Sequence, residues 1–182
     1  MKSVLISIRP QWCEKIMSRE KTIEVRKTAP KEVPFKAYIY ETKESKMRYL
    51  NDRFNSFLNN KSHYTDMGKV IGEFICDKVD EYTVSHYEAE YRVTHVEQKA
   101  MCLNQPELIQ YGKGKTLYGW HISDLKIYDK PKELSEFRRV KVTRGHIPEG
   151  VTGFKKLLYS SSVMVYSPTR PPQSWFYVEE LK

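Results

Sequence analysis

Residues 18–26, SREKTIEVR, pass from the end of an amphipathic helix into a short alternating strand. Because successive side chains of a strand face opposite ways, Ile23 and Val25 share one face. That apolar face predicts burial against a core. The opposite face and the turn that leads into it carry a hydroxyl, a carboxylate, a guanidinium and an ammonium, from Thr22, Glu24, Arg26 and Lys21.

The polar face supports three interpretations. In the first, Lys21 and Arg26 hold phosphate or carboxylate oxygens, while Glu24 accepts from a base amino group or fixes Arg26. In the second, Lys21 is desolvated, its pKa falls, and it acts as a base or nucleophile beside Glu24. In the third, the strand is a solvated edge, because surface charge is the norm in proteins.

The composition favours a folded protein with a polyanionic partner. The chain has 182 residues, of which 40% are hydrophobic, and it carries a formal net charge of +8. This length supports one domain with a real core, and the charge favours nucleic acid as the partner. No apolar run is long enough for a signal peptide or a membrane helix, so we expect a cytoplasmic protein without a membrane partner.

Neither a metal site nor a cofactor is expected. Cys13, Cys76 and Cys102 are widely spaced, and no cysteine or histidine cluster has metal-ligand spacing. The apolar neighbours of Cys13 and Cys76 predict buried thiols. The run Gly112-Lys113-Gly114-Lys115 lacks P-loop spacing and has the chemistry of a turn.

Periodicity predicts mostly strands. Strands are expected over residues 2–8, 22–26, 36–42, 68–79 and 116–128, with one or two more in 156–182. Helices are expected over 10–18, 43–60, within 93–102 and over 105–112, the last closing at Gly112. Residues 132–155 read as basic and irregular, Gly72 as a bend or bulge, and Pro131 as a strand stop.

This pattern predicts an α+β protein built as a small mixed β-barrel with short flanking helices. We expect a single domain over residues 1–182, with an inserted helix at about 43–60 and a C-terminal extension at about 131–182. The basic face of the inserted helix and the basic tail leave open a protein-interaction module.

The central stretch resembles the ASCH-domain signature GxKxxExR, a branch of the PUA-like superfamily, through Lys21, Glu24 and Arg26. "VLISIRPQWCEKIMS" (4–18) is similar to the first strand and helix of that domain, and "KVIGEF" (69–74) to a later strand. "PPQSWFYV" (171–178) resembles a longer bacterial and phage form. The resemblance implies a PUA-like barrel, a cleft beside the first helix and a link to RNA. Arg19 replaces the motif glycine, so the tight turn there need not have a positive φ.

The expected ligand site combines the motif with its neighbours. We expect an RNA or nucleotide-like ligand to contact Arg9, Lys21, Thr22, Glu24, Arg26, Tyr40 and Trp120. The expected nucleic-acid patch outside the cleft is Arg138, Arg139, Lys141 and Arg144, with a solvated loop as the other interpretation. His121 is expected to be a hydrogen-bonded structural residue.

The resemblance also allows a hydrolase at the same cleft, either a modified-nucleoside amidohydrolase or a ribonuclease. As an enzyme, the protein would use Lys21 and Glu24 as catalytic residues. The amidohydrolase type implied by the resemblance has a threonine where this chain has Glu24, and a further acidic residue downstream, for which Glu73 is the candidate. Whether the protein is an enzyme is therefore left open.

Overall fold

The computed structural model describes residues 1–43, 67–85, 90–143 and 162–181. The helix expected over 43–60 falls almost wholly outside the described residues. Within them, the elements are β1 (Lys2–Ile8), α1 (Pro10–Met17), β2 (Ile23–Arg26), β3 (Phe35–Glu41), β4 (Val70–Cys76), β5 (Val79–Tyr82), α3 (His95–Met101), α4 (Gln105–Gly112), β6 (Leu117–His121), β7 (Ser123–Lys132), the short 3₁₀ helix η2 (Leu134–Glu136), β8 (Arg139–Thr143), β9 (Ser162–Tyr166) and β10 (Trp175–Val178).

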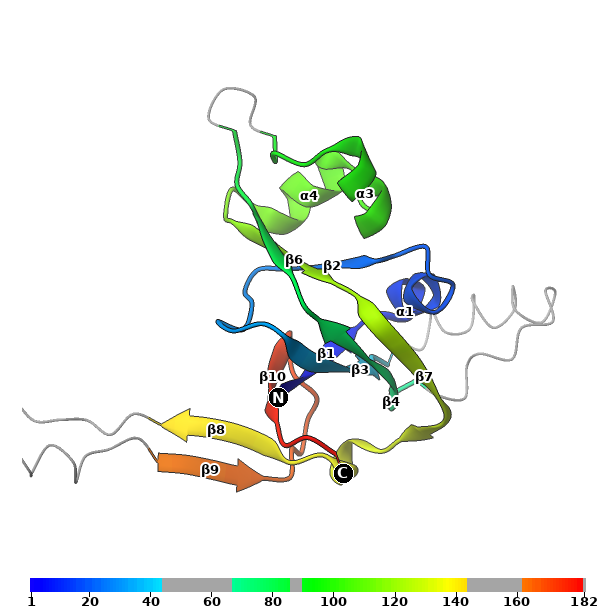
Figure 1. Ribbon diagram of the computed structural model, residues 1–182, viewed down its shortest axis with the longest axis vertical. Helices are drawn as coiled ribbons and strands as arrows, with labels where there is room; N and C mark the ends of the chain where they lie inside the picture. The colour runs from blue at the N-terminus through cyan, green and yellow to red at the C-terminus, as the bar shows by residue number, and fades with distance from the viewer. Residues whose placement is uncertain (44–66, 86–89, 144–161, 182) are drawn as a thin grey trace, which may run out of the picture.

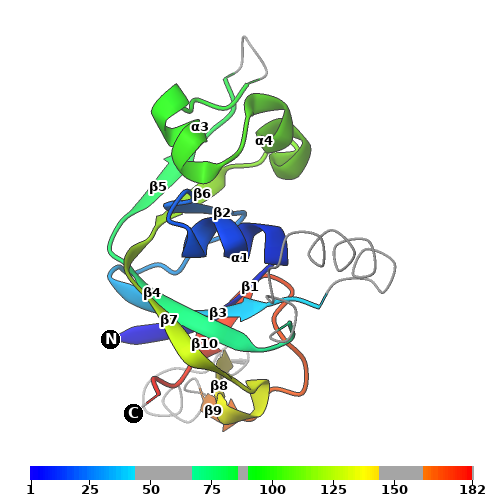
Figure 2. The same ribbon diagram turned by 90° about the vertical axis from the view of Figure 1, so that its right-hand side faces the viewer.

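The strands of the described residues form two sheets. The larger has the order β7-β4-β3-β1-β10-β8-β9, and the smaller β2-β6-β5. In both views α1 lies beside the small sheet, while α3 and α4 lie at the far end of the molecule from β8 and β9 (Figures 1 and 2). An α+β fold is confirmed, but the pairing of these strands does not close into a barrel.

β1 is the centre of the larger sheet. It pairs in parallel with β3 and antiparallel with β10, so the C-terminal region is part of the sheet. One face of β1, with Val4, Ile6 and Ile8, packs with Ile16 of α1 and Trp120 of β6. The opposite face packs Leu5 against Tyr38, Tyr40, Val70, Phe137, Phe176 and Val178.

A third apolar cluster lies between the small sheet and the helices α3 and α4. Ile23 and Val25 of β2 pack with Leu117 of β6 and with Met101 and Leu108 from the helices. The alternation expected for residues 22–26 therefore holds for the apolar face. Since Ile23 and Val25 face α3 and α4, the alternate residues Glu24 and Arg26 face α1 and the larger sheet.

Two expected long strands are each divided between the sheets. Residues 68–79 contain all of β4 and the first residue of β5, because the chain turns at Asp77 and Lys78, where the carbonyl of Lys78 accepts from His121 N. Residues 116–128 likewise supply β6 and part of β7. Neither turn contains a glycine or a proline, so no breaker residue marked the change of sheet.

Other boundaries also differ from expectation. Pro131 does not stop β7, because β7 is an edge strand of the larger sheet and its register to β4 is irregular there. Residues 132–155, expected to be irregular, contain η2 and β8. Gly72 does lie at a register irregularity, and a Cβ there would stand 2.5 Å from the Lys126 carbonyl oxygen.

α4 ends at Gly112, as expected, but Gly112 is not the left-handed residue that caps the helix. Gly112 is the last helical residue, and the left-handed cap is Lys113, with φ of 52°. A Cβ on Gly112 would collide with the Tyr91 hydroxyl. The glycine is thus required for close packing rather than for a positive φ.

Candidate nucleotide-binding cavity

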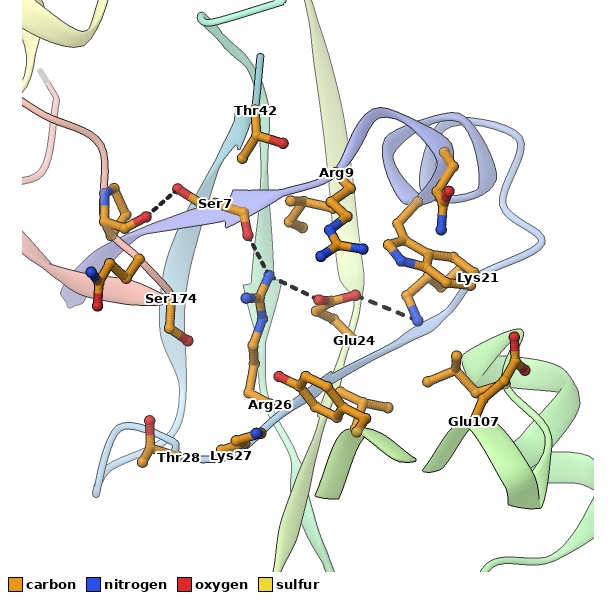
Figure 3. Close-up of a pocket in the computed structure, with 18 of the residues that line it drawn as sticks. Ser7, Arg9, Lys21, Glu24, Arg26, Lys27, Thr28, Thr42, Glu107 and Ser174 are labelled. Carbon is orange, nitrogen blue, oxygen red and sulfur yellow. Dashed lines mark hydrogen bonds and ion pairs between the residues drawn. The ribbon is translucent and has the colours of Figure 1, made fainter. Parts of the chain in front are cut away.

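A cavity of about 870 Å³ lies where β1, α1, β2, α4 and the segment before β10 meet. Figure 3 shows Arg26, Glu24, Arg9 and Lys21 across its centre, Ser7 and Ser174 on one side and Glu107 on the other. Its other lining residues are Ile8, Gln11, Trp12, Val25, Lys27, Thr28, Thr42, Leu103, Gln110, Tyr111, Pro172 and Gln173. The cavity is therefore built from segments far apart in the sequence.

Lys21, Glu24 and Arg26 form a buried ionic cluster in the cavity wall. Glu24 Oε1 lies 2.9 Å from Arg26 Nη2, and Glu24 Oε2 lies 3.4 Å from Lys21 Nζ. Arg26 Nη2 also donates to the Ser7 carbonyl at 2.6 Å. Each residue is less than 10% exposed. Glu24 thus binds one cation with each oxygen, which favours its role in fixing Arg26.

The Lys21 ammonium is enclosed by acceptors. Nζ donates to the Met101 carbonyl, lies near Glu24, and is 5.1 Å from the centre of the Trp12 ring. Burial lowers the pKa of Lys21, and the nearby Glu24 carboxylate opposes that shift. Lys21 is therefore desolvated, which the second interpretation of the motif requires and the solvated-edge interpretation does not allow.

Local backbone contacts bring this cluster together. Lys21 N donates to the Lys15 carbonyl, and Thr22 N donates to the Ala100 carbonyl. The connection from α1 to β2 passes through Arg19, whose φ is 62°. The expectation that this turn needs no positive φ is wrong. Arg19 takes the left-handed conformation in place of glycine, which strains a side-chain-bearing residue.

The C-terminal segment closes one side of the cavity. Ser7 Oγ donates to the Pro172 carbonyl at 2.7 Å, and Ser7 N donates to the Ser174 carbonyl at 3.0 Å. Trp175 Nε1 donates to Oγ1 of Thr28 at 3.0 Å. The region expected to be an extension therefore supplies part of the site.

Cations at the cavity mouth are more accessible than the buried cluster. Arg9 and Lys27 are exposed and line the cavity. Lys27 Nζ lies 4.9 Å from the centre of the Tyr111 ring. Tyr111 is 37% exposed and Trp12 is half-buried, so both rings have accessible surface.

The two aromatic rings expected to contact the ligand lie outside the cavity. Trp120 is fully buried, packed edge-on against Phe35 and Trp175, and Tyr40 lies in the core on the opposite face of the larger sheet. Neither side chain reaches the cavity. Thr22 is exposed and also lies outside its lining. Trp12 and Tyr111 were not among the predicted contacts. Trp12 belongs to the apolar stripe of residues 10–18 (Trp12, Cys13, Ile16 and Met17), whose helical spacing predicted a buried face.

Other predicted residues have structural partners elsewhere. Tyr128 Oη donates to Glu73, and Lys36 Nζ lies 3.7 Å from the same carboxylate. Glu73 is therefore not the third member of an assembly with Lys21. His121 Nε2 is 2.7 Å from Asp80 Oδ2, as expected for a structural histidine. Cys13 and Cys76 are buried, as predicted.

The expected nucleic-acid patch is only partly available. Arg138 lies 3.3 Å from Glu179, and the guanidinium of Arg139 stacks 4.6 Å from the centre of the Phe176 ring. Arg139 is thus half-buried against an aromatic ring. Lys141 is exposed, and Arg144 lies outside the described residues.

The described part of the chain contains neither a metal-binding cluster nor a membrane-spanning helix. No group of three or more histidine, cysteine, aspartate or glutamate side chains is placed to hold a metal ion. No helix in this part is both long and apolar enough to cross a membrane.

Fold and cavity together define the class of the molecule, an α+β protein with an ASCH-like fold. The particular likeness is to the crystal structure of ASCH from Zymomonas mobilis, with 16% sequence identity and a TM-score of 0.56 over 98% of this chain and 89% of that one. Two mutant proteins of ZmASCH from the same organism match similarly, with TM-scores of 0.55 and 0.56. Comparison with protein-family models and with curated proteins gives no match. The likeness at this identity shows the fold.

Proposed function

We propose that the cavity binds one nucleotide unit, either of RNA or of a free nucleotide-like ligand. The observation that carries the proposal is the pairing of cations with accessible aromatic rings around one cavity. Arg9 and Lys27 are exposed at its mouth, and Trp12 and Tyr111 present ring surface to it. Phosphate favours the cations, and a base favours the rings.

Size and charge agree with this proposal. A volume of about 870 Å³ lies within the range of roughly 300–1,000 Å³ usual for small-ligand sites. Glu24 neutralises part of the charge of Lys21 and Arg26. The cluster keeps an excess positive charge, to which Arg9 and Lys27 add, so an anion is favoured over a neutral ligand. The two sheets pack around a shared core. We include in the proposal that this fold is related to the PUA-like superfamily.

The roles within the cavity follow from exposure. Arg9 and Lys27 contact phosphate, since their charged groups are accessible. Arg26 and Lys21 are held by protein acceptors and supply a fixed positive field. Trp12 and Tyr111 contact the base. Glu24 positions both buried cations.

A hydrolase at the same cavity is the second candidate, favoured by the lowered pKa of Lys21 beside Glu24. Two observations favour binding over this alternative. The Lys21 ammonium already donates to the Met101 carbonyl, and Glu73 is remote from it. A protein-interaction module based on residues 43–60 depends on a segment outside the described residues.

The test uses end-labelled single-stranded and hairpin RNA in an anisotropy titration over a salt series. Arg9→Gln should weaken binding and lower the salt slope by about 0.7, the value for one phosphate contact on a single strand. Lys126→Gln removes the same unit charge from the exposed surface of β7 and should leave both quantities unchanged. Equal affinities for the two variants would refute the role of Arg9.

Tryptophan fluorescence tests the aromatic contact independently. Trp12 is the cavity tryptophan, whereas Trp120 is fully buried. A nucleotide stacked on Trp12 should quench the emission, and Trp12→Phe should remove the quenching while retaining binding. Quenching of equal size in Trp12→Phe would place the ligand elsewhere.

A denaturing gel of the same samples separates binding from hydrolysis. Intact RNA after incubation supports the binding protein. RNA shortened by the wild type, with a loss of about 10² or more in rate for Lys21→Met, would establish the hydrolase instead. Lys21→Met keeps the length of the side chain and removes its amine.

A further inference from the structure

We infer that the cavity serves a single-stranded nucleic acid whose chain continues past Tyr111 over Lys113 and Lys115. This inference rests on the proposed function, because it starts from a nucleotide bound in the cavity. It adds the class of ligand, a polynucleotide rather than a free nucleotide, and a surface that extends beyond the cavity lining to Lys113 and Lys115. We refer to Lys27, Tyr111, Lys113 and Lys115 as the mouth track.

The track begins within the cavity lining. Lys27 and Tyr111 both line the cavity and both are exposed, with Lys27 Nζ over the tyrosine ring. A ring and a cation placed together offer a stacking surface and a phosphate contact at one point. A nucleotide chain that leaves the cavity at this point meets both groups.

The Gly112–Lys115 turn follows Tyr111 in the chain and connects α4 to β6. Lys113 follows Tyr111 by two residues, within one helical turn of about 5.4 Å rise. The pairing of Arg26 with Tyr118 places Lys27 beside the residues that lead into β6. The ring contact with Tyr111 and the strand register thus place Lys27 between the end of α4 and the start of β6, the two elements that the turn connects. Figure 1 shows this connection between α4 and β6.

The turn presents its lysines on a fixed backbone. Lys113 and Gly114 both have positive φ, 52° and 76°. Lys113 N donates to the Ile109 carbonyl at 2.9 Å, and Tyr91 Oη donates to the Lys115 carbonyl at 2.6 Å. Gly112 packs directly against Tyr91. Since the backbone is held at both ends, ordering it on binding loses little entropy.

Their charges are available to a ligand. Lys113 and Lys115 are exposed, and within the described ranges neither they nor Lys27 form an ion pair with a carboxylate. The C-terminal end of α4 favours cations through its dipole, which accounts for lysine at the turn. The helix dipole does not account for Lys27, which belongs to the connection after β2. A single strand is favoured over a duplex because a base must leave its stack to enter the cavity.

The experiment measures binding against chain length. Uridylates from the mononucleotide to about ten nucleotides, the size range of single-strand sites, compete with a labelled oligomer. The protein variants are wild type, Lys113→Gln with Lys115→Gln, and the control Lys126→Gln with Lys130→Gln. Both control lysines are exposed on β7, and each pair removes the same charge. Deoxyuridylates of the same lengths show whether the track distinguishes RNA from DNA.

The turn variant, Lys113→Gln with Lys115→Gln, should bind the mononucleotide with an affinity within about twofold of the wild-type value. The increase in affinity from mononucleotide to oligomer should be about tenfold smaller than in wild type. Its salt slope should fall by about 1.4, for two phosphate contacts on a single strand. An unchanged length gain in the turn variant, with oligomer binding intact, overturns the track alone. Failure of wild type to bind both mononucleotide and oligomer refutes the proposed function itself.

Discussion

Nη2 of Arg26 lies 2.9 Å from Oε1 of Glu24, and both side chains are buried. Lys21 approaches the other carboxylate oxygen. One anion therefore compensates two buried cations. Charges removed from water require such compensation, so the carboxylate is needed for stability as well as for the geometry of the cavity.

Glu24→Gln should destabilise the protein by about 3 kcal/mol, because it leaves two cations without a buried counter-charge. Urea denaturation followed by circular dichroism measures the change. Glu20→Gln is the matched control, since Glu20 forms an exposed pair with Lys15 and its loss should change stability by less than about 1 kcal/mol. Equally small changes in the two variants would show that Lys21 and Arg26 need no counter-charge.

Arg19→Gly should stabilise the protein by about 0.5–1 kcal/mol. The left-handed conformation costs a residue with a Cβ about 1–2 kcal/mol, while glycine loses only about 0.5–1 kcal/mol more entropy on folding. Thermal denaturation measures the effect. The neighbouring Ser18 has φ of −74°, so Ser18→Gly should destabilise instead. A melting temperature lowered by Arg19→Gly would contradict the positive φ.

The interaction between Asp80 and His121 predicts a pH-dependent contribution to stability. Burial acts to raise the pKa of Asp80, but hydrogen bonds from Lys78 and His121 lower it overall below the ordinary value of 3.8. The folded state therefore binds fewer protons there than the unfolded state. Its stabilisation is complete above pH 3.8 and is lost as pH falls through the lowered pKa.

Asp80→Asn should lose about 1 kcal/mol at neutral pH, and the difference from wild type should shrink below pH 3.8. Urea titrations at several pH values measure it. Asp129→Asn, at an exposed position of β7, serves as the control. A difference that stays constant down to the acid transition would refute the contribution of the Asp80 carboxylate.

The three cysteines should differ in reactivity. Burial raises the pKa of the Cys13 thiol, and it raises that of Cys76 to about 12. Cys102 is partly exposed at the end of α3. A thiol reagent at mildly alkaline pH should label Cys102 alone in the native protein and all three after denaturation. Cys102→Ser should abolish native labelling, and rapid labelling that persists in this variant would contradict the burial of the other two.

The alternation in residues 22–26 and the stripe in 10–18 predicted the local elements and grouped Lys21, Glu24 and Arg26 near the first helix. These residues are close in sequence, so strand and helix periods determine most of their placement. The same reasoning failed at 68–79 and 116–128. Neither turn contains a glycine or a proline, and the pairing partners of the strands reveal the change of sheet.

The sequence by itself determined the α+β character, the buried cysteines and the polar face of β2, because each depends on local periodicity or on apolar neighbours. Tertiary structure decided which aromatic rings meet that face. Trp120 and Tyr40 pack into cores, whereas Trp12 and Tyr111 line the cavity. It also brought Pro172 and Ser174 to Ser7. Contacts between such distant segments arise from the order of strands in a sheet, which no local pattern encodes.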